Sequence, residues 1–223
     1  MYCEQSCPGG RFETVPYPFG FNSQCKIQLN CTSQGDVLIG AFTVHQINSD
    51  DILVSLPAKC GRPIHTLTQL YAKHYAPLST NTILLENCTQ QMETCKLPSL
   101  HTNCNYAKSG NGNMSCYSTD MTRMFLDYED LKMTGCRFMV SAVAMVMIGD
   151  GASVSLDVEV IRLAWWLYGT CDDCSVQADC TTIVSPVDGS NGYQCKCKSG
   201  FHGDGYKGRL GCDQEGMSGS PIY

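Results

Sequence analysis

Cysteine is the residue type with the clearest chemistry in this sequence. Sixteen cysteines occur in 223 residues, far above cytosolic usage. They form two even-numbered groups, separated by a gap between Cys136 and Cys171. The first group is Cys3, Cys7, Cys25, Cys31, Cys60, Cys88, Cys95, Cys104, Cys116 and Cys136, and the second is Cys171, Cys174, Cys180, Cys195, Cys197 and Cys212. Disulfides can therefore form within each group, in an oxidising compartment, although the pairing in the first group stays open.

The second group also admits a metal. Cys171-x2-Cys174 followed by Cys195-x-Cys197 could supply four thiolates to a tetrahedral zinc ion. We favour disulfides, because so many cysteines indicate a secreted chain. Calcium would need six to eight oxygen ligands, and residues 167–170, just before the first cysteine of the group, contain no carboxylate. We expect neither a metal nor a cofactor.

A different chemistry is suggested by the interval from residue 59 to residue 74, which contains basic but no acidic residues. Arginine can hold a carboxylate through two parallel hydrogen bonds, lysine can pair with it as a point charge, and tyrosine offers a sugar both a ring and a hydroxyl. An ordinary solvated surface around Cys60 has the same composition. The candidate ligand-binding residues are Lys59, Arg62, His65, Tyr71, Lys73 and His74, with Tyr75 beside them.

Catalysis finds little support in the sequence. The G-x-S-x-G, H-E-x-x-H, His-Arg-Asp and Asp-Phe-Gly motifs are all absent. Residues 203–208 match G-x-G-x-x-G, but they lie between two cysteines and not between a strand and a helix. Asp50-Asp51 is more typical of a turn than of a glycosidase carboxylate pair. We therefore predict no catalytic residues and a chain that binds a ligand.

Further polar and aromatic residues fit a secreted binding protein. Asn30, Asn87 and Asn113 each begin an N-glycosylation triplet. Glycans there would help to keep soluble a chain with only 16% charged residues. Trp165 and Trp166 could stack on sugar rings, but large aromatic residues are usually buried, so we expect structural roles for both.

Composition and charge exclude several classes of protein. An apolar content of 43% excludes disorder along the whole length, and a net charge of -6 argues against a nucleic-acid partner. Residues 1–164 and 165–223 each carry a net charge of -3, so a polyanion would need a local basic patch or bridging cations. The apolar run 139–148 is too short to cross a bilayer and no signal peptide opens the chain. We expect an ectodomain that lacks its targeting and anchoring segments.

The elements that must position these residues are mostly strands. Residues 37–47 and 52–56 are rich in branched apolar side chains and flank the turn 48–51, which predicts a hairpin. Residues 82–85 are a short strand candidate. Residues 138–148 are apolar on both faces, as expected of a central strand covered on each side.

Two local patterns complete this assignment. Apolar and polar residues alternate from Ser153 to Val160, and the slip at Val160-Ile161 predicts a bulge in a half-buried strand. Asp120 is expected to cap a short helix that ends at Gly135. Helix content is therefore predicted to be low.

The last six cysteines, with Tyr193 and the glycine- and aromatic-rich run 200–206, resemble an epidermal-growth-factor-like (EGF-like) module. A module of this size depends on its bridges, each worth ~2–4 kcal/mol. The resemblance implies two small hairpins and the bridges Cys171–Cys180, Cys174–Cys195 and Cys197–Cys212.

The N-terminal stretch carries a second resemblance. Cys3-x3-Cys7, the segment Val15-Pro16-Tyr17-Pro18-Phe19-Gly20-Phe21, Cys25 and Leu29-Asn30-Cys31 occur in that order. The order resembles the cysteine-rich galacturonan-binding domain of plant wall-associated receptor kinases. Weaker matches at residues 56–60, 84–88, 127–138 and 164–167 extend it over nearly the whole chain. One departure is Pro8-Gly9-Gly10 after Cys7, where many members have Cys-Gly.

This resemblance implies a mostly β, disulfide-rich ectodomain of a plasma-membrane receptor, on the extracellular side facing the cell wall, with a serine/threonine kinase in the missing part. The expected ligand is an acidic wall polysaccharide, namely pectin or oligogalacturonides, and the alternative is a peptide or protein. We expect a galacturonan-binding-like region over 1–164, with two subdomains split near 90–116 as an open option. The EGF-like module would span 165–213, and a flexible tail 214–223.

Overall fold

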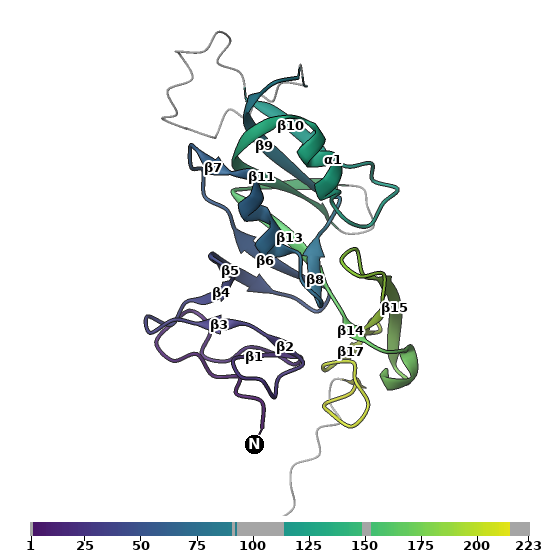
Figure 1. Cartoon of the computed structure of the whole chain (residues 1–223). Coiled ribbons are helices and arrows are strands. Elements are labelled where there is room, and N and C mark those ends of the chain that lie inside the picture. The colour runs from purple at the N-terminus through teal and green to yellow at the C-terminus, as the bar shows by residue number, and fades with distance from the viewer. Residues whose placement is uncertain (1, 91, 93–113, 149–152, 215–223) are drawn as a thin grey trace, which may run out of the picture. The chain divides into compact units, whose positions relative to one another are not determined.

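The computed structural model describes residues 2–90, 92, 114–148 and 153–214 of the chain (Figure 1). They belong to two compact units. Unit 1 comprises residues 1–37, 47–51 and 165–223, and unit 2 comprises residues 38–46 and 52–164. Strands predominate over helices, and disulfide bonds are numerous. The prediction of a mostly β, disulfide-rich fold is confirmed.

The predicted domain division has a boundary in common with these units, at residues 164 and 165. Unit 1, however, joins the module that follows this boundary with the N-terminal residues 1–37 and the turn 47–51. Most of the region 90–116 lies outside the described residues, as does the tail 214–223 apart from Gln214. The division into domains therefore stays a prediction.

One sheet of unit 2 is built around strand β11 (Cys136–Ile148). Antiparallel β9 (Asn81–Cys88) and β12 (Ser153–Val158) flank it. The short β10 (Ser115–Ser118) pairs with β9, and β7 (Arg62–Pro63) pairs with the beginning of β11. Every residue of β11 from 139 to 144 is buried, so the prediction of a central, doubly covered strand is confirmed.

The other sheet of unit 2 contains the predicted hairpin. Neighbouring strands run in the order β4 (Val37–Ile39), β5 (Phe42–Ile47), β6 (Asp51–Ser55), β13 (Val160–Trp165) and β8 (Tyr75–Pro77). The backbone N–H of Asn48 donates to the carbonyl of Asp51 over 2.8 Å, which closes the turn as expected. The segment 37–47 is not one strand, because Gly40 turns the chain between β4 and β5 with a φ of 57°.

The predicted break near Val160 lies at Glu159, where the chain leaves the sheet of β11 and enters that of β6. Glu159 has a φ of 61°, which is uncommon for a residue with a side chain. Three hydrogen bonds hold it: its N–H donates to Ala142 (3.0 Å), its carbonyl accepts from Leu56 (2.7 Å), and its carboxylate accepts from the N–H of Ala58 (2.7 Å). The break is therefore a change of sheet and not a bulge within one ladder.

The helix prediction was wrong about where the helix begins. Helix α1 covers only Tyr128–Met133, and its N-cap is Asp127. The side chain of Asp120 instead accepts a hydrogen bond from the N–H of Thr122 in a turn. Gly135, with a φ of 68°, follows the helix as expected. Besides α1, unit 2 contains the 3-10 helix Ile64–Leu70.

The N-terminal part of unit 1 is fixed by two disulfides, Cys3–Cys25 and Cys7–Cys31. Its strands are short: β1 (Phe19–Gly20) pairs in parallel with β2 (Ile27–Gln28), and β3 (Asn30–Cys31) follows. Phe19 is fully buried and meets the ring of Trp165 edge-on, with centroids 5.2 Å apart. Phe19 thus anchors the Pro-Tyr-Pro-Phe-Gly segment to the core of this unit.

The last part of unit 1 contains two small antiparallel arrangements. One is the sheet β14 (Leu167–Tyr168), β16 (Asn191–Cys197) and β15 (Ala178–Val184), and the other is the pair β17 (Phe201–His202) and β18 (Asp213–Gln214). The bridges Cys171–Cys180, Cys174–Cys195 and Cys197–Cys212 are the pairs that the EGF-like resemblance implies.

The other cysteines of the first group are also bonded where they are described. Cys88 pairs with Cys136, and Cys60 and Cys116 are disulfide-bonded. Cys95 and Cys104 lie outside the described residues. Over the ranges that the structure describes, no helix has the length and apolar character that a membrane span requires.

Candidate functional site

Two of the six predicted ligand-binding residues lie together. Lys59 and Arg62 line a groove of about 360 Å³ in unit 2, beside β5, β6 and the 3-10 helix. We call it the Lys59 groove. Its other polar lining residues are Thr43, Ser55, Thr66 and Gln69. His65, Tyr71, Lys73 and His74 do not line it.

Arg62 is half-buried and positioned by backbone oxygens. Its guanidinium donates to the carbonyl of Val140 over 3.0 Å and to that of Pro57 over 2.6 Å. Burial lowers the pKa of the guanidinium from its usual value. Among the described residues it forms no ion pair with a carboxylate. The groove therefore has a fixed cation whose remaining N–H groups can receive an anionic ligand.

Lys59 is exposed, and the loop that carries it is held by two acidic residues. The carboxylate of Glu159 accepts from the N–H of Ala58, and that of Glu86 accepts from the N–H of Gly61 over 2.6 Å. These bonds fix the loop on either side of Lys59. The two negative charges also weaken the positive potential of the groove, so an anionic ligand would need several contacts at once.

The polar rim of the groove can form hydrogen bonds with hydroxyl groups. Gln69 accepts from the N–H of Ala41 over 2.8 Å through its carbonyl oxygen, which orients its amide N–H groups. Thr66 donates to the carbonyl of Pro63, and its oxygen can still accept. Thr43 is exposed on β5. Hydroxyls, an amide and two cations along one groove suit a polyhydroxylated acid.

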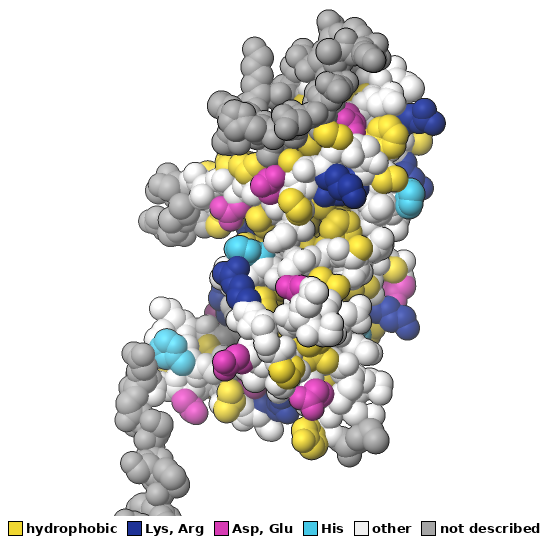
Figure 2. All heavy atoms as spheres, turned by 90° about the vertical axis from the view of Figure 1, so that its left-hand side faces the viewer, with side chains coloured by type: hydrophobic (Ala, Val, Ile, Leu, Met, Phe, Trp, Pro, Cys, Tyr) yellow, Lys and Arg dark blue, Asp and Glu magenta, His cyan; other side chains and the backbone are white. Residues whose placement is uncertain are grey.

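The other predicted residues lie elsewhere in unit 2. The Tyr71 hydroxyl donates to the carbonyl of Leu126 over 2.8 Å, and burial raises its pKa far above the usual value. Tyr71 is therefore occupied within the protein. His65 and Lys73 are exposed, and His74 is half-buried. Figure 2 shows that lysine and arginine side chains on one face lie in several separate places, with acidic side chains among them.

Both tryptophans are structural, as the burial habits of large aromatic residues predict. Trp165 is 2% exposed and Trp166 is fully buried, so neither offers an open ring face to a sugar. The indole N–H of Trp165 donates to the carbonyl of Asn48 over 3.3 Å. The expectation of structural roles is confirmed.

The glycosylation acceptors Asn30 and Asn87 are exposed, and Asn113 lies outside the described residues. Their modification stays a prediction. In the ranges that the structure describes, no group of histidine, cysteine, aspartate or glutamate side chains is arranged to hold a metal ion.

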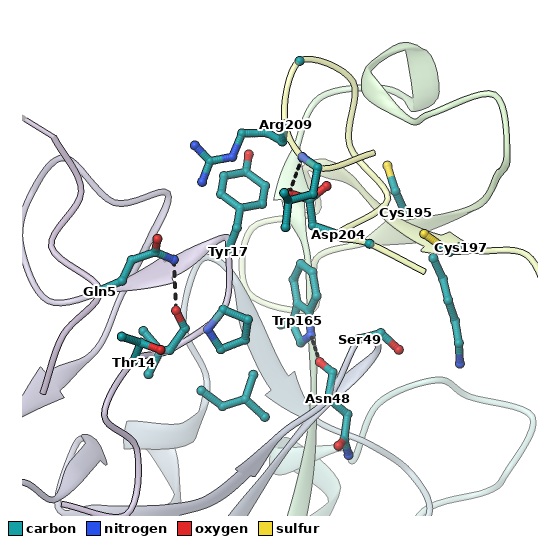
Figure 3. Close-up of a pocket in the computed structure, with 17 residues that line it drawn as sticks. Gln5, Thr14, Tyr17, Asn48, Ser49, Trp165, Cys195, Cys197, Asp204 and Arg209 are labelled. Atoms are coloured by element: carbon teal, nitrogen blue, oxygen red, sulfur yellow. Dashed lines mark hydrogen bonds between the residues drawn. The ribbon is translucent and has the colours of Figure 1, made fainter. Parts of the chain in front are cut away.

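Sequence reasoning missed a larger hollow, of about 1030 Å³, within unit 1 (Figure 3). We call it the Arg209 hollow. Tyr17, from the N-terminal signature, and Arg209, from the last loop of the module, both line it. The only hint in the sequence was the glycine- and aromatic-rich run 200–206 just before Arg209. The contact between such distant residues appears only in the fold.

The chain was compared with known proteins. It is 34% identical over 215 residues to wall-associated receptor kinase-like 14 of Arabidopsis thaliana, covering 92% of this chain and 30% of that protein. It is 30% identical over 209 residues to wall-associated receptor kinase-like 21 of the same plant, covering 88% of this chain and 32% of that protein. The chain thus spans about a third of the length of these curated relatives. No family model and no solved structure matches it.

Proposed function

Because the chain belongs to the wall-associated receptor kinase-like family, as a disulfide-rich ectodomain and not as the kinase part, we propose that it is the ligand-binding region of a plant cell-surface receptor. We further propose that it faces the cell wall from the extracellular side of the plasma membrane. Its ligand would be an acidic wall polysaccharide, namely de-esterified pectin or its oligogalacturonide fragments. The kinase activity would belong to the rest of the protein.

The observation that carries the polysaccharide proposal is the pair Arg62 and Lys59 in the Lys59 groove. Two backbone carbonyls fix Arg62, and among the described residues no carboxylate neutralises it. Its remaining N–H groups can hold one uronate carboxylate, and Lys59 can pair with the next along the chain. The hydroxyls and the amide at the rim would meet the sugar hydroxyl groups.

The distribution of charge also favours unit 2 as the place where a polyanion binds. Unit 2 contains nine basic and nine acidic residues, whereas unit 1 contains six basic and twelve acidic residues. Unit 2 is therefore neutral, and the whole net charge of -6 lies in unit 1. Long-range repulsion of a polyuronate is weakest at unit 2. The proposed contacts with Lys59 and Arg62 act at short range on that neutral background.

Replacing Lys59 by glutamine should weaken the binding of a de-esterified oligogalacturonide by about two- to fivefold, the effect of one exposed ion pair. The matched control is Lys132→Gln, which removes the same charge from α1 of unit 2 and should leave affinity unchanged. Isothermal titration at low salt measures both. Arg62 is unsuitable for this test, because its loss would leave the carbonyls of Val140 and Pro57 without their partner.

Salt provides a further check on the same variants. The Debye length falls from about 30 Å at 0.01 M to about 8 Å at 0.15 M, so polyuronate affinity should drop steeply over that range. The difference between wild type and Lys59→Gln should shrink in parallel. If Lys59→Gln binds as well as wild type at low salt, the Lys59 groove is not the site.

A further inference from the structure

The Arg209 hollow lies outside the proposed polysaccharide site and is built entirely from residues of unit 1. Its lining comes from Gln5, the N-terminal segment 14–17, the turn 47–49, Trp165, and the module residues 195–197, 203–204 and 208–210. At about 1030 Å³ it is as large as the roomier ligand pockets of proteins. Figure 3 shows the side chains of Arg209 and Tyr17 next to each other, with Trp165 and Asn48 below them in the view.

Arg209 is held in place by an aromatic ring. Its guanidinium carbon lies 4.2 Å from the centroid of the Tyr17 ring, within the range of a cation–π contact. Tyr17 is itself fixed by the edge of Tyr206, with centroids 5.2 Å apart. Burial raises the pKa of Tyr17, so its hydroxyl stays neutral at ordinary pH. The stacked guanidinium thus has a defined position while its N–H groups stay accessible.

The other charged side chains that line this hollow are already engaged. Asp204 accepts from the backbone N–H groups of Tyr206, Leu210 and Gly211. Lys196 pairs with Asp50 over 2.7 Å. Arg209, by contrast, forms no ion pair with any residue that the structure describes. It is therefore the cation of this hollow that a ligand anion can pair with.

The inner part of the hollow is apolar. Val15 and Trp165 are buried beneath it, and Ile47 is half-buried beside them. The indole N–H of Trp165 donates to the carbonyl of Asn48, so this polar group is satisfied within the protein. Leu210 stands on the rim with 76% of its surface exposed. Sugar hydroxyls would lose hydrogen bonds against these groups, whereas an apolar side chain would gain by burial.

We infer that the Arg209 hollow is a peptide-binding site. The peptide carries a carboxylate that pairs with the Arg209 guanidinium, and an adjacent apolar side chain that packs against the accessible surface of Ile47 and Leu210. A carboxylate matches the fork of a stacked arginine in two parallel hydrogen bonds. The acidic surface of unit 1 would repel a polyanion but tolerates a peptide with one such group.

The test uses the whole chain and a phage library of random heptapeptides. Selected sequences should share aspartate or glutamate next to a large apolar residue. Synthetic peptides with these sequences should bind Arg209→Gln about tenfold more weakly than wild type, the usual effect of losing one desolvated charge-assisted pair. Lys207→Gln is the matched control, because Lys207 lies in the same loop but does not line the hollow, and its affinity should match wild type.

Two comparisons make the result specific. Replacing the peptide carboxylate by its amide should lower the affinity for wild type by the same factor as Arg209→Gln does. The same replacement should not lower the affinity for Arg209→Gln any further. Arg209→Lys, which keeps the charge, should bind the peptides with an affinity between those of wild type and Arg209→Gln. It replaces the glutamine variant in the test if that variant does not fold. An absence of selected peptides, equal binding by Arg209→Gln, or displacement of the peptides by oligogalacturonide would overturn the inference.

Discussion

Replacing Asn81 by alanine is expected to destabilise the protein by about 3 kcal/mol, because it removes a buried network of hydrogen bonds. The Asn81 side chain is fully buried at the start of β9. Its amide donates to the carbonyls of Leu78 (2.7 Å) and Arg162 (2.8 Å), and its oxygen accepts from the N–H of Arg162 (2.8 Å). Alanine would remove the partner of that part-buried N–H and of both carbonyls.

Differential scanning calorimetry should therefore show the midpoint of Asn81→Ala lowered by roughly 6–12 °C, given the size of the chain. The matched control is Asn191→Ala, at an exposed position of β16, which should change stability by less than about 0.5 kcal/mol. Asn81→Asp should be no better than alanine, because its second oxygen would face two carbonyls. A loss below about 1 kcal/mol would contradict this view of Asn81 as a clamp between β9 and β13.

Replacing Gly20 by alanine is expected to cost about 2–4 kcal/mol in unit 1, because the new methyl group has no space. A Cβ atom on Gly20 would lie 2.2 Å from the sulfur of Cys25, 2.5 Å from that of Cys3 and 2.6 Å from the carbonyl oxygen of Glu4. The disulfide or the backbone must move to accommodate it. Gly20 is the last residue of the Pro-Tyr-Pro-Phe-Gly segment, and the lack of space for a Cβ atom explains why glycine stands there.

A comparison with Gly189→Ala separates crowding from backbone strain. Gly189 has a φ of 71°, and a Cβ atom added there would meet nothing within 4 Å, so alanine should cost only the ~1–2 kcal/mol of a left-handed residue. Thermal unfolding measures both variants, and peptide mapping reports the Cys3–Cys25 bridge. A Gly20→Ala protein with the bridge intact and wild-type stability would contradict the expected clash.

Sequence alone was sufficient where a pattern is local. Branched apolar residues around the turn 48–51 predicted the hairpin, and the unbroken apolar run predicted β11 as a central strand. The start of α1 could not be read in this way, because tertiary contacts override a local cap. The N–H of Leu126 donates to the carbonyl of Pro77, and that of Ser79 donates to the carbonyl of Met124, which keeps residues 124–126 out of a helix.

The candidate site was predictable only in part, for the same reason. A run of basic residues identified Lys59 and Arg62, but nothing nearby in sequence reveals that Arg62 donates to Val140, 78 positions away. Tyr71 looked available for a ligand until the fold paired it with Leu126. The Arg209 hollow is lined by segments far apart in the sequence, so composition could not reveal it.

The most direct test of the proposed function compares two forms of one oligogalacturonide of defined length, with free carboxylates and fully methyl-esterified. Ion pairs with Arg62 and Lys59 need the free carboxylate, whereas the hydroxyl contacts are common to both forms. Titration of the whole chain at low salt should show the free acid binding about tenfold tighter than the ester. Equal affinity for the two forms, or no binding of the free acid, would contradict recognition of an acidic polysaccharide.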